Sequence, residues 1–200
     1  MKRILVAVLL SLAILSCKTY SVKAVYFSGG FASVSNLKYV CDETWNSNAC
    51  TTYVKSMANL WSAESSNVYF NYDSTPRRYN GCFTQPVVVR HTTHSDPDLL
   101  GEIIPYKTFT CYSATLAEPT DTWVKVGVNI YGQNIHDMAD YVGMSESTLL
   151  NAIILHELGH VVSVAHPTSS STIAIMQTAL NNFYSLQPYD ISSLVAKWGS

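Results

Sequence analysis

The sequence predicts an α+β domain in which a mixed β-sheet is covered by helices. Apolar residues recur at helical spacing in three segments, and strand-like segments lie between the first of these and the other two. The chain has 200 residues, of which 48% are hydrophobic and 13% are charged, as expected for a globular domain. A formal net charge of −2, without any basic run, argues against a nucleic-acid-binding protein.

The N-terminus has the features of an export signal. Lys2 and Arg3 precede an apolar run over residues 4–15, which fits a secretory signal and is shorter than the roughly twenty residues of a membrane span. Residues 14–17, Ile-Leu-Ser-Cys, resemble a bacterial lipobox, whose cysteine is lipidated and begins the mature chain.

We therefore expect a signal peptide with a lipobox over residues 1–17, a tether over 18–24 and a folded domain over 25–200. In that case a lipid on Cys17 would anchor the exported protein to a membrane. The alternative is ordinary signal-peptidase cleavage, for example after Ala24, which would release a freely secreted protein.

The cysteines agree with export. Apart from Cys17, four cysteines remain, an even number that suggests two disulfides in an exported chain. Three connectivities are open to four cysteines, and one or more could stay free. The simplest choice pairs nearest neighbours, Cys41 with Cys50 and Cys82 with Cys111.

The elements follow from periodicity. A first helix is predicted from Asn48 to about Ala63, because apolar residues recur there at helical spacing. Strands are predicted at 67–72, 86–89 and 123–131, where apolar residues alternate with others or form a short run bounded by polar residues.

Two helices are predicted in the last third of the chain. Ser145 is a suitable N-cap for the first, and Glu146 suits its first turn. The second is expected to start near Pro188 and to stop at Gly199. The apolar stripe of the first helix is formed by Leu149, Leu150, Ile153, Ile154 and Leu158. The stripe of the second is formed by Ile191, Leu194, Val195 and Trp198.

The stretch HELGHVVSVAH, residues 156–166, combines three histidines with a glutamate. Residues four apart share one face of a helix, so His156 and His160 can place two imidazole nitrogens on one ion. Glu157 lies about 100° further around the helix axis. It can lean towards the open side of a metal and act as a general base without being a ligand.

His166 is the expected third ligand, since catalytic zinc needs three protein ligands and one open position. A straight helix would carry it well away from His160, so the chain must leave the helix near Ser163 and turn back. Pro167 agrees with a helix that has already ended. The alternative is three histidines that merely pack in and after a core helix.

The stretch HELGHVVSVAH resembles HExxHxxGxxH, the zinc motif of the metzincin metallopeptidases. Residues 175–177, Ile-Met-Gln, look like the Met-turn of that family. Residues 186–199 are similar to the last helix of its matrixin branch, the matrix-metalloprotease-like proteins. The likeness is strong over 146–199 and loose over 45–72.

The resemblance implies a metzincin-like zincin fold, with a twisted mixed sheet, an active-site helix, a Met-turn and a C-terminal helix. It implies that His156, His160 and His166 bind one catalytic Zn²⁺, that Glu157 is general base and proton shuttle, and that Met176 is the Met-turn residue. Ser163 stands where the family has glycine. Serine in a left-handed turn costs about 1 kcal/mol, which a zinc site can tolerate.

The function implied is that of an exported zinc endopeptidase, with residues 25–200 as the metallopeptidase catalytic domain. It would act, as a monomer, on protein or peptide substrates, and residues 177–184 would wall the pocket beyond the cut bond. Two alternatives stay open: a zinc hydrolase that acts on a non-peptide bond, and a surface binding protein with a non-catalytic metal site. The presence of Glu157 argues against the second, because a site that needs only ligands has no use for a base.

Further polar residues are candidates for a structural Ca²⁺ or Zn²⁺, although they lack a defined ligand spacing. The two groups are His91, His94, Asp96 and Asp98, and His136, Asp137 and Asp140. The alternative interpretation is a solvated loop for the first group and a turn or helix start for the second. Tyr184, Tyr189 and Trp198 could flank a cleft, but core packing is the preferred interpretation.

Overall fold

The computed structural model describes residues 24–178 and 184–200. Its main feature is a six-stranded mixed sheet with the strand order β2-β1-β5-β8-β6-β7. The strands β1, β2, β5 and β8 are parallel to one another. Strand β6 is antiparallel to β8, and β7 is antiparallel to β6. The strands span Leu37–Cys41 (β1), Phe70–Tyr72 (β2), Val87–Thr92 (β5), Gly101–Phe109 (β6), Ala114–Leu116 (β7) and Lys125–Tyr131 (β8). A separate hairpin is formed by Arg78–Tyr79 (β3) and Cys82–Phe83 (β4).

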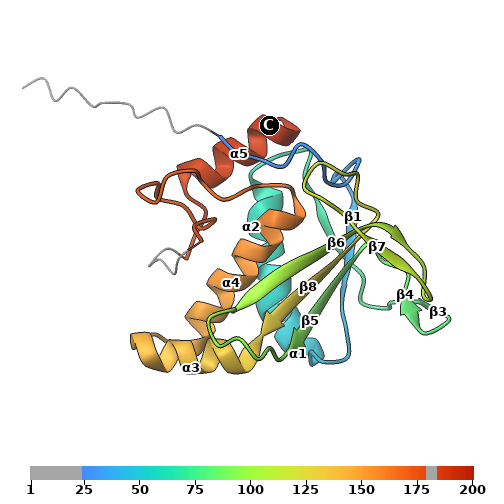
Figure 1. Cartoon of the computed structure of the whole chain (residues 1–200), viewed down its shortest axis with the longest axis horizontal. Coiled ribbons are helices and arrows are strands. Elements are labelled where there is room, and N and C mark those ends of the chain that lie inside the picture. Colours follow the sequence, from blue (N-terminus) through green and yellow to red (C-terminus); the bar gives the residue numbers. More distant parts are fainter. Residues whose placement is uncertain (1–23, 179–183) are drawn as a thin grey trace, which may run out of the picture.

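Helices α2 and α4 lie side by side on one face of this sheet, while α3 and α5 lie at its two ends (Figure 1). The helices span Ser47–Ala49 (α1), Cys50–Lys55 (η1, a π-helix), Ser56–Ala63 (α2), Gly132–Val142 (α3), Glu146–Val161 (α4) and Pro188–Trp198 (α5). The α+β class and the mixed sheet covered by helices are therefore confirmed. The predicted first helix is also confirmed, as the continuous run α1-η1-α2 with π geometry in its middle.

The predicted strands are found with shifted ends. Only Phe70–Tyr72 of the segment 67–72 forms a strand, because Val68 closes a turn onto Ser65 and the chain becomes regular only after Tyr69, which bonds to Val34 and Leu37. β5 runs on to Thr92 because it pairs with β8 over six residues. Strands β1, β3, β4, β6 and β7 were not expected from the sequence, and helix α3 was considered only as a turn or helix start around His136.

Both late helices start as the sequence predicts. The Ser145 side chain accepts a hydrogen bond from the Thr148 amide at 3.2 Å, and Glu146 occupies the first turn of α4. Pro188 is the first residue of α5, and Gly199 ends it with a φ of 84°.

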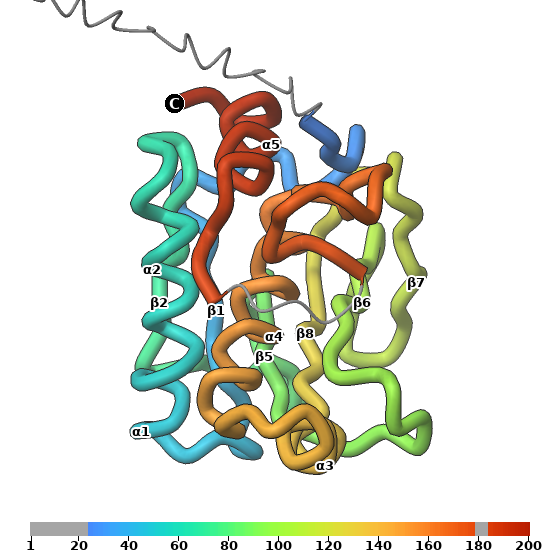
Figure 2. The backbone as a smooth tube through the Cα atoms, turned by 90° about the vertical axis from the view of Figure 1, so that its left-hand side faces the viewer, coloured from blue at the N-terminus to red at the C-terminus, as the bar shows by residue number. Residues whose placement is uncertain are grey.

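Helix α4 is buried on most of its surface, so it forms part of the core rather than a half-exposed layer. Trp61 of α2 is fully buried against it and donates a hydrogen bond from Nε1 to the Leu155 carbonyl at 2.8 Å. This contact fixes α2 and α4 relative to each other. The view in Figure 2 shows α4 in front of the middle of the sheet, so the residues on this helix have a rigid support.

The disulfides Cys41–Cys50 and Cys82–Cys111 confirm nearest-neighbour pairing. Disulfides form in oxidising compartments, which indicates an exported protein. The expected signal peptide and lipobox over 1–17 lie outside the described residues, as does the expected tether apart from Ala24. Within the described ranges, no helix combines the length and the apolar character that crossing a membrane requires.

Candidate metal centre

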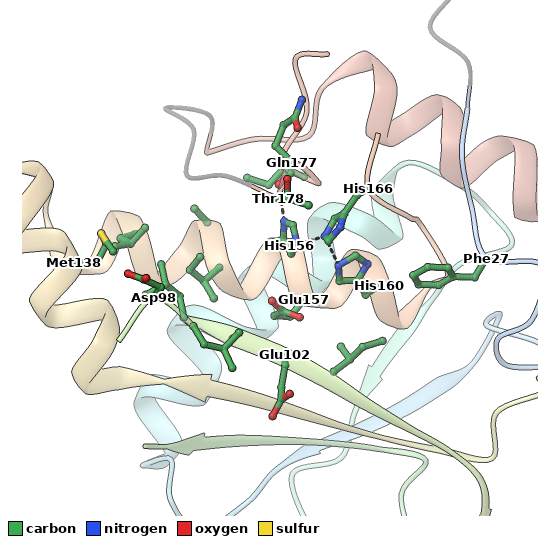
Figure 3. Close-up of a pocket in the computed structure, with 18 residues that line it drawn as sticks. Phe27, Asp98, Glu102, Met138, His156, Glu157, His160, His166, Gln177 and Thr178 are labelled. Atoms are coloured by element: carbon green, nitrogen blue, oxygen red, sulfur yellow. Dashed lines mark hydrogen bonds between the residues drawn. The ribbon is translucent and has the colours of Figure 1, made fainter. Parts of the chain in front are cut away.

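The structure brings His156, His160 and His166 together at one point (Figure 3). The Nε2 atom of His166 lies 3.1 Å from Nε2 of His156 and 2.9 Å from Nε2 of His160. All three ligand atoms lie within 4.8 Å of one another, and no other group of three such residues in the described part of the chain does so. The helical pair projects from α4, and His166 stands on the chain that turns back after it.

The chemistry of these nitrogens fits a bound cation. Nδ1 of His156 lies 2.8 Å from the Ile175 carbonyl, and Nδ1 of His160 lies 2.9 Å from the Val164 carbonyl. A carbonyl only accepts, so each Nδ1 carries the proton and each Nε2 presents a lone pair. His166 can donate to only one of these lone pairs, so the cluster could hold a cation that all three nitrogens face.

The distances also suit zinc. Zn–N bonds of about 2.0–2.1 Å in a tetrahedral site place two nitrogens about 3.3 Å apart. The observed separations of 2.9 and 3.1 Å need only a small outward movement to reach this value. Burial lowers the pKa of His156 to about 4, and it also lowers the pKa values of His160 and His166. Each shift favours the neutral imidazole, which is the form that binds a metal.

His166 reaches its partners because the chain turns back at Ser163, as the sequence predicts. Ser163 has a φ of 68°, the left-handed conformation that reverses the chain after α4. Four successive carbonyls of the turn each accept a hydrogen bond. The donors are Trp198 Nε1 to Val162, the Phe27 amide to Ser163, the His160 ring to Val164 and the Tyr189 hydroxyl to Ala165.

The segment around Met176 supports the helical pair from another side. Met176 is fully buried, and a Cβ atom at Gly159 would lie 2.4 Å from its sulfur. Only glycine therefore allows this close approach between α4 and the Met176 chain. Asp190 of α5 holds the same segment, because its carboxylate accepts from the Ile175 amide at 2.9 Å and from the Met176 amide at 3.3 Å.

Glu157 points into the same region from α4 and is only 6% exposed. Burial, and to a smaller extent the negative charge of Glu102, raise its pKa to about 8. The side chain fits there because its neighbour on β6 is glycine: a Cβ atom at Gly101 would lie 3.1 Å from Oε1 of Glu157. Glu102 itself accepts hydrogen bonds from Asn129 and from the Tyr131 hydroxyl on β8.

The three histidines and Glu157 line an open cavity of about 630 Å³ (Figure 3). One wall is the first part of β6, and another is the apolar side of α4 that precedes His156. Gln177 and Thr178 close a third side, as expected for the start of the 177–184 loop; residues 179–183 of that loop lie outside the described chain. The apolar residues of the α4 wall are Leu149, Ala152 and Ile153, with Met138 of α3 beside them.

The other candidate ligands do not form a comparable group among the described residues. In the first group His91 packs on Trp45, with ring centroids 5.1 Å apart, and His94 packs on Tyr131. In the second, Nδ1 of His136 lies 3.0 Å from a Glu146 carboxylate oxygen. This contact raises the pKa of His136 and joins α3 to α4, so it serves as an interhelical ion pair.

Several residues that shape the site were not singled out for this role in the sequence. Phe27 lines the cavity and stacks on His160, with centroids 5.7 Å apart. Tyr189 and Trp198 pack as expected, but they also hold the His166 turn through hydrogen bonds. The sequence could have indicated Asp190, because an acidic residue two positions after Pro188 suits the capping box of a helix. The contacts of Phe27, Tyr189 and Trp198 join residues far apart in the chain, so no local sequence pattern could have predicted them.

No family model matches this chain, and no curated protein does. One similar solved structure is described as the GM1 bound form of the ECX AB5 holotoxin. It is 15% identical, and the alignment covers 82% of this chain and 80% of that chain with a TM-score of 0.47. This similarity is too low to carry a functional argument.

The expected membership of the metzincin family, in its matrixin-like branch, is corrected by these comparisons. No family model and no curated relative supports it. The physical reason is that the motif is short and encodes ligand geometry. Two histidines four residues apart on a helix can arise on unrelated folds, so a metal-binding pattern identifies a site more reliably than a family.

Proposed function

We propose that this chain is an exported, zinc-dependent endopeptidase. One observation carries the proposal: three imidazole Nε2 atoms meet beside a buried glutamate at the wall of an open cavity. A purely structural zinc site is usually closed by four protein ligands, whereas a catalytic site keeps one position open. Three histidines with no fourth ligand within reach, in the described part of the chain, fit the catalytic type.

We assign the ion to His156, His160 and His166 through their Nε2 atoms. Zinc suits three imidazole nitrogens, and when bound it would acidify a coordinated water and polarise a carbonyl group. The carbonyls of Ile175 and Val164 orient the two helical imidazoles, as outer hydrogen bonds commonly do for metal-binding histidines. Met176 supports the site by packing against Gly159, between the two helical ligands.

Glu157 is the proposed general base. Its carboxylate takes a proton from water at Oε1 or Oε2 and later delivers it to the amine that leaves. Burial makes this carboxylate more basic than an exposed glutamate, which strengthens it as a proton acceptor once it is ionised. A nearby divalent cation would stabilise the carboxylate and bring this pKa down from about 8 towards the acidic side.

The first part of β6 favours a peptide as the substrate. Residues 101–106 pair with β8 on one side, whereas β7 pairs on the other side only from Tyr106 onwards. Gly101, Glu102 and Ile103 line the cavity. An extended peptide could therefore add to this edge of β6, which lacks a strand partner among the described residues, and such addition is a common mode of peptide recognition. A non-peptide substrate has no equivalent use for such an edge.

The remaining assignments belong to the same proposal. Residues 25–200 form the catalytic domain, the protein acts as a monomer on protein or peptide substrates, and it has no nucleic-acid partner. Where the lipobox is used, a lipid on Cys17 attaches it to a membrane.

Removal of the metal tests this function. We expect a chelator to abolish cleavage of an unfolded protein substrate, and one equivalent of Zn²⁺ to restore it, because the ion supplies the reactive chemistry. Metal content and cleavage are measured on the same samples. A chelator-sensitive enzyme that hydrolyses esters but not proteins would favour the non-peptide hydrolase. A protein that binds zinc without any turnover would favour the binding protein.

A further inference from the structure

Lys197, near the end of α5, has an unusual environment for a lysine. Its Nζ atom donates to three successive backbone carbonyls, those of Phe27, Ser28 and Gly29, each at 2.9 Å. No carboxylate of the described chain lies within ion-pair distance of it. Burial lowers the pKa of Lys197, and the rings of Tyr26 and Trp198 lie 5.5 and 5.4 Å from Nζ. The three carbonyls therefore take the place of water around this ammonium group.

The segment that Lys197 holds is paired with the turn before His166. The Phe27 amide donates to the Ser163 carbonyl at 2.8 Å, and the Ala165 amide donates to the Val25 carbonyl at 3.2 Å. Between them, Tyr26 and Val164 form an antiparallel bridge. Ala165 directly precedes His166, so this pairing fixes the backbone from which the third ligand projects.

The same segment also covers a helical ligand. The Phe27 ring stacks on the His160 imidazole with an interplanar angle of 27°, and it forms part of the cavity wall. Figure 3 shows Phe27 entering from a different part of the chain than the three histidines. The segment thus touches one ligand directly and fixes the backbone of another.

We propose that Lys197 is a positioning residue for the metal centre: through residues 25–29 it fixes the turn that carries His166 and the ring that covers His160. This inference rests on the proposed metal site but concerns metal affinity, not peptide cleavage. His166 is the ligand most dependent on such support, because it stands outside α4. Groups that orient metal ligands in this way commonly change metal affinity by about 10–100-fold when they are removed.

The test compares two lysines whose ammonium groups donate to backbone carbonyls, the half-buried Lys197 and the buried Lys125, in the full-length protein. Lys197→Met removes the ammonium group but keeps the length of the side chain. Lys125→Met is the matched control, because Nζ of Lys125 also donates to backbone carbonyls, those of Phe83 and Gln85, and also lies over an aromatic ring. Lys125 is on β8 and does not line the cavity.

Three quantities are measured for each variant: the Zn²⁺ dissociation constant by competition with a chelator, the visible spectrum of the Co²⁺ form, and the denaturant midpoint of the metal-free protein. We expect Lys197→Met to raise the dissociation constant about 10–100-fold and to alter the Co²⁺ bands. Lys125→Met should lower the midpoint while leaving both metal measurements unchanged. Lys197→Arg, which keeps a donating cation, should recover most of the affinity.

Unchanged zinc affinity and an unchanged Co²⁺ spectrum in Lys197→Met would overturn the inference. An equal loss of affinity in Lys125→Met would also overturn it, since the effect would then follow from stability alone. Should Lys197→Met fail to fold, Lys197→Gln, which keeps an amide donor, is subjected to the same criteria. A wild-type protein that binds no zinc would reject the metal site itself, whereas a zinc-binding wild type without peptidase activity would reject only the proposed function.

Discussion

Ser163 illustrates, at the scale of a single residue, how a strained position is tolerated. Its φ of 68° costs a non-glycine residue about 1 kcal/mol or a little more. The side chain has room because residue 30 is glycine: a Cβ atom there would lie 2.1 Å from the Ser163 hydroxyl oxygen. That hydroxyl also donates to the Gly29 carbonyl, at 3.4 Å. Local fit therefore offsets part of the strain at the turn on which His166 depends.

Gly159 provides the first test at this scale. A Cβ atom there would lie 2.4 Å from the Met176 sulfur and 2.6 Å from Cζ2 of Trp61. On an open helix, glycine to alanine would stabilise by about 1 kcal/mol through helix propensity. Here the added methyl group would overpack the contact with Met176 and Trp61, and this cost outweighs the gain in helix propensity. We therefore expect Gly159→Ala to lower the free energy of unfolding by about 1–3 kcal/mol. Chemical denaturation measures this directly, and a variant more stable than the wild type would show that α4 and Met176 are not in close contact.

At the scale of elements, α5 is the support of the site rather than a covering helix. It contributes Tyr189 and Trp198 to the His166 turn, Asp190 to the Met176 segment and Lys197 to the N-terminal segment. The Asp190 carboxylate also accepts from the Gln187 amide at 2.8 Å, which completes the capping box of the helix. One helix thus ties together three segments that are distant in sequence.

Asp190→Asn tests this role of α5. An amide has one acceptor oxygen, so its NH₂ group would face a backbone N–H that the carboxylate now satisfies. We expect a loss of about 1.5–3 kcal/mol in the free energy of unfolding, the usual range for hydrogen bonds to a charged group. Asp137→Asn on α3 is the control, because that exposed carboxylate accepts only from the Gln133 side chain among the described contacts. Equal effects of the two substitutions in chemical denaturation would show that Asp190 does not hold the Met176 segment.

The elements that the sequence predicts are those with a clear period. Helices α4 and α5 have both a cap signal and an apolar stripe, and β5 and β8 are rich in valine and isoleucine. β6, in contrast, contains Gly101, Pro105 and Lys107 within nine residues and shows no alternation in burial. It becomes a strand because β8 and β7 pair with it, which no local pattern reveals.

The candidate site, too, has features that the sequence predicts and features that only the folded structure determines. The helical spacing of His156 and His160 and the need for a turn near Ser163 are local properties, so the sequence predicts all three histidines. Whether His166 arrives at the right point depends on hydrogen bonds from Tyr189, Trp198 and Phe27. Those contacts join residues far apart in the chain, and only the folded structure brings them together.

At the scale of the whole molecule, the centre lies where four parts of the fold meet: α4, the turn that follows it, the first part of β6 and the Met176 segment. His156, Glu157 and His160 stand on α4 and His166 on the turn, while β6 and the Met176 segment complete the surroundings of the cavity. This arrangement explains why the sequence can predict the meeting of three histidines while the family inferred from them is wrong. The local motif specifies ligand geometry, while the scaffold around it is set by the rest of the chain.

The central claim is that three imidazoles hold one ion and that Glu157 moves the proton. Glu157→Gln is nearly isosteric, keeps every proposed ligand and removes only the basic carboxylate. Zinc content and turnover of an unfolded protein substrate are measured together on the wild type and on this variant. We expect one zinc ion per chain in both, with turnover lowered at least about 10²-fold in the variant. Cleavage by Glu157→Gln at the wild-type rate, or a wild type that cleaves without any bound metal, would contradict the proposed mechanism.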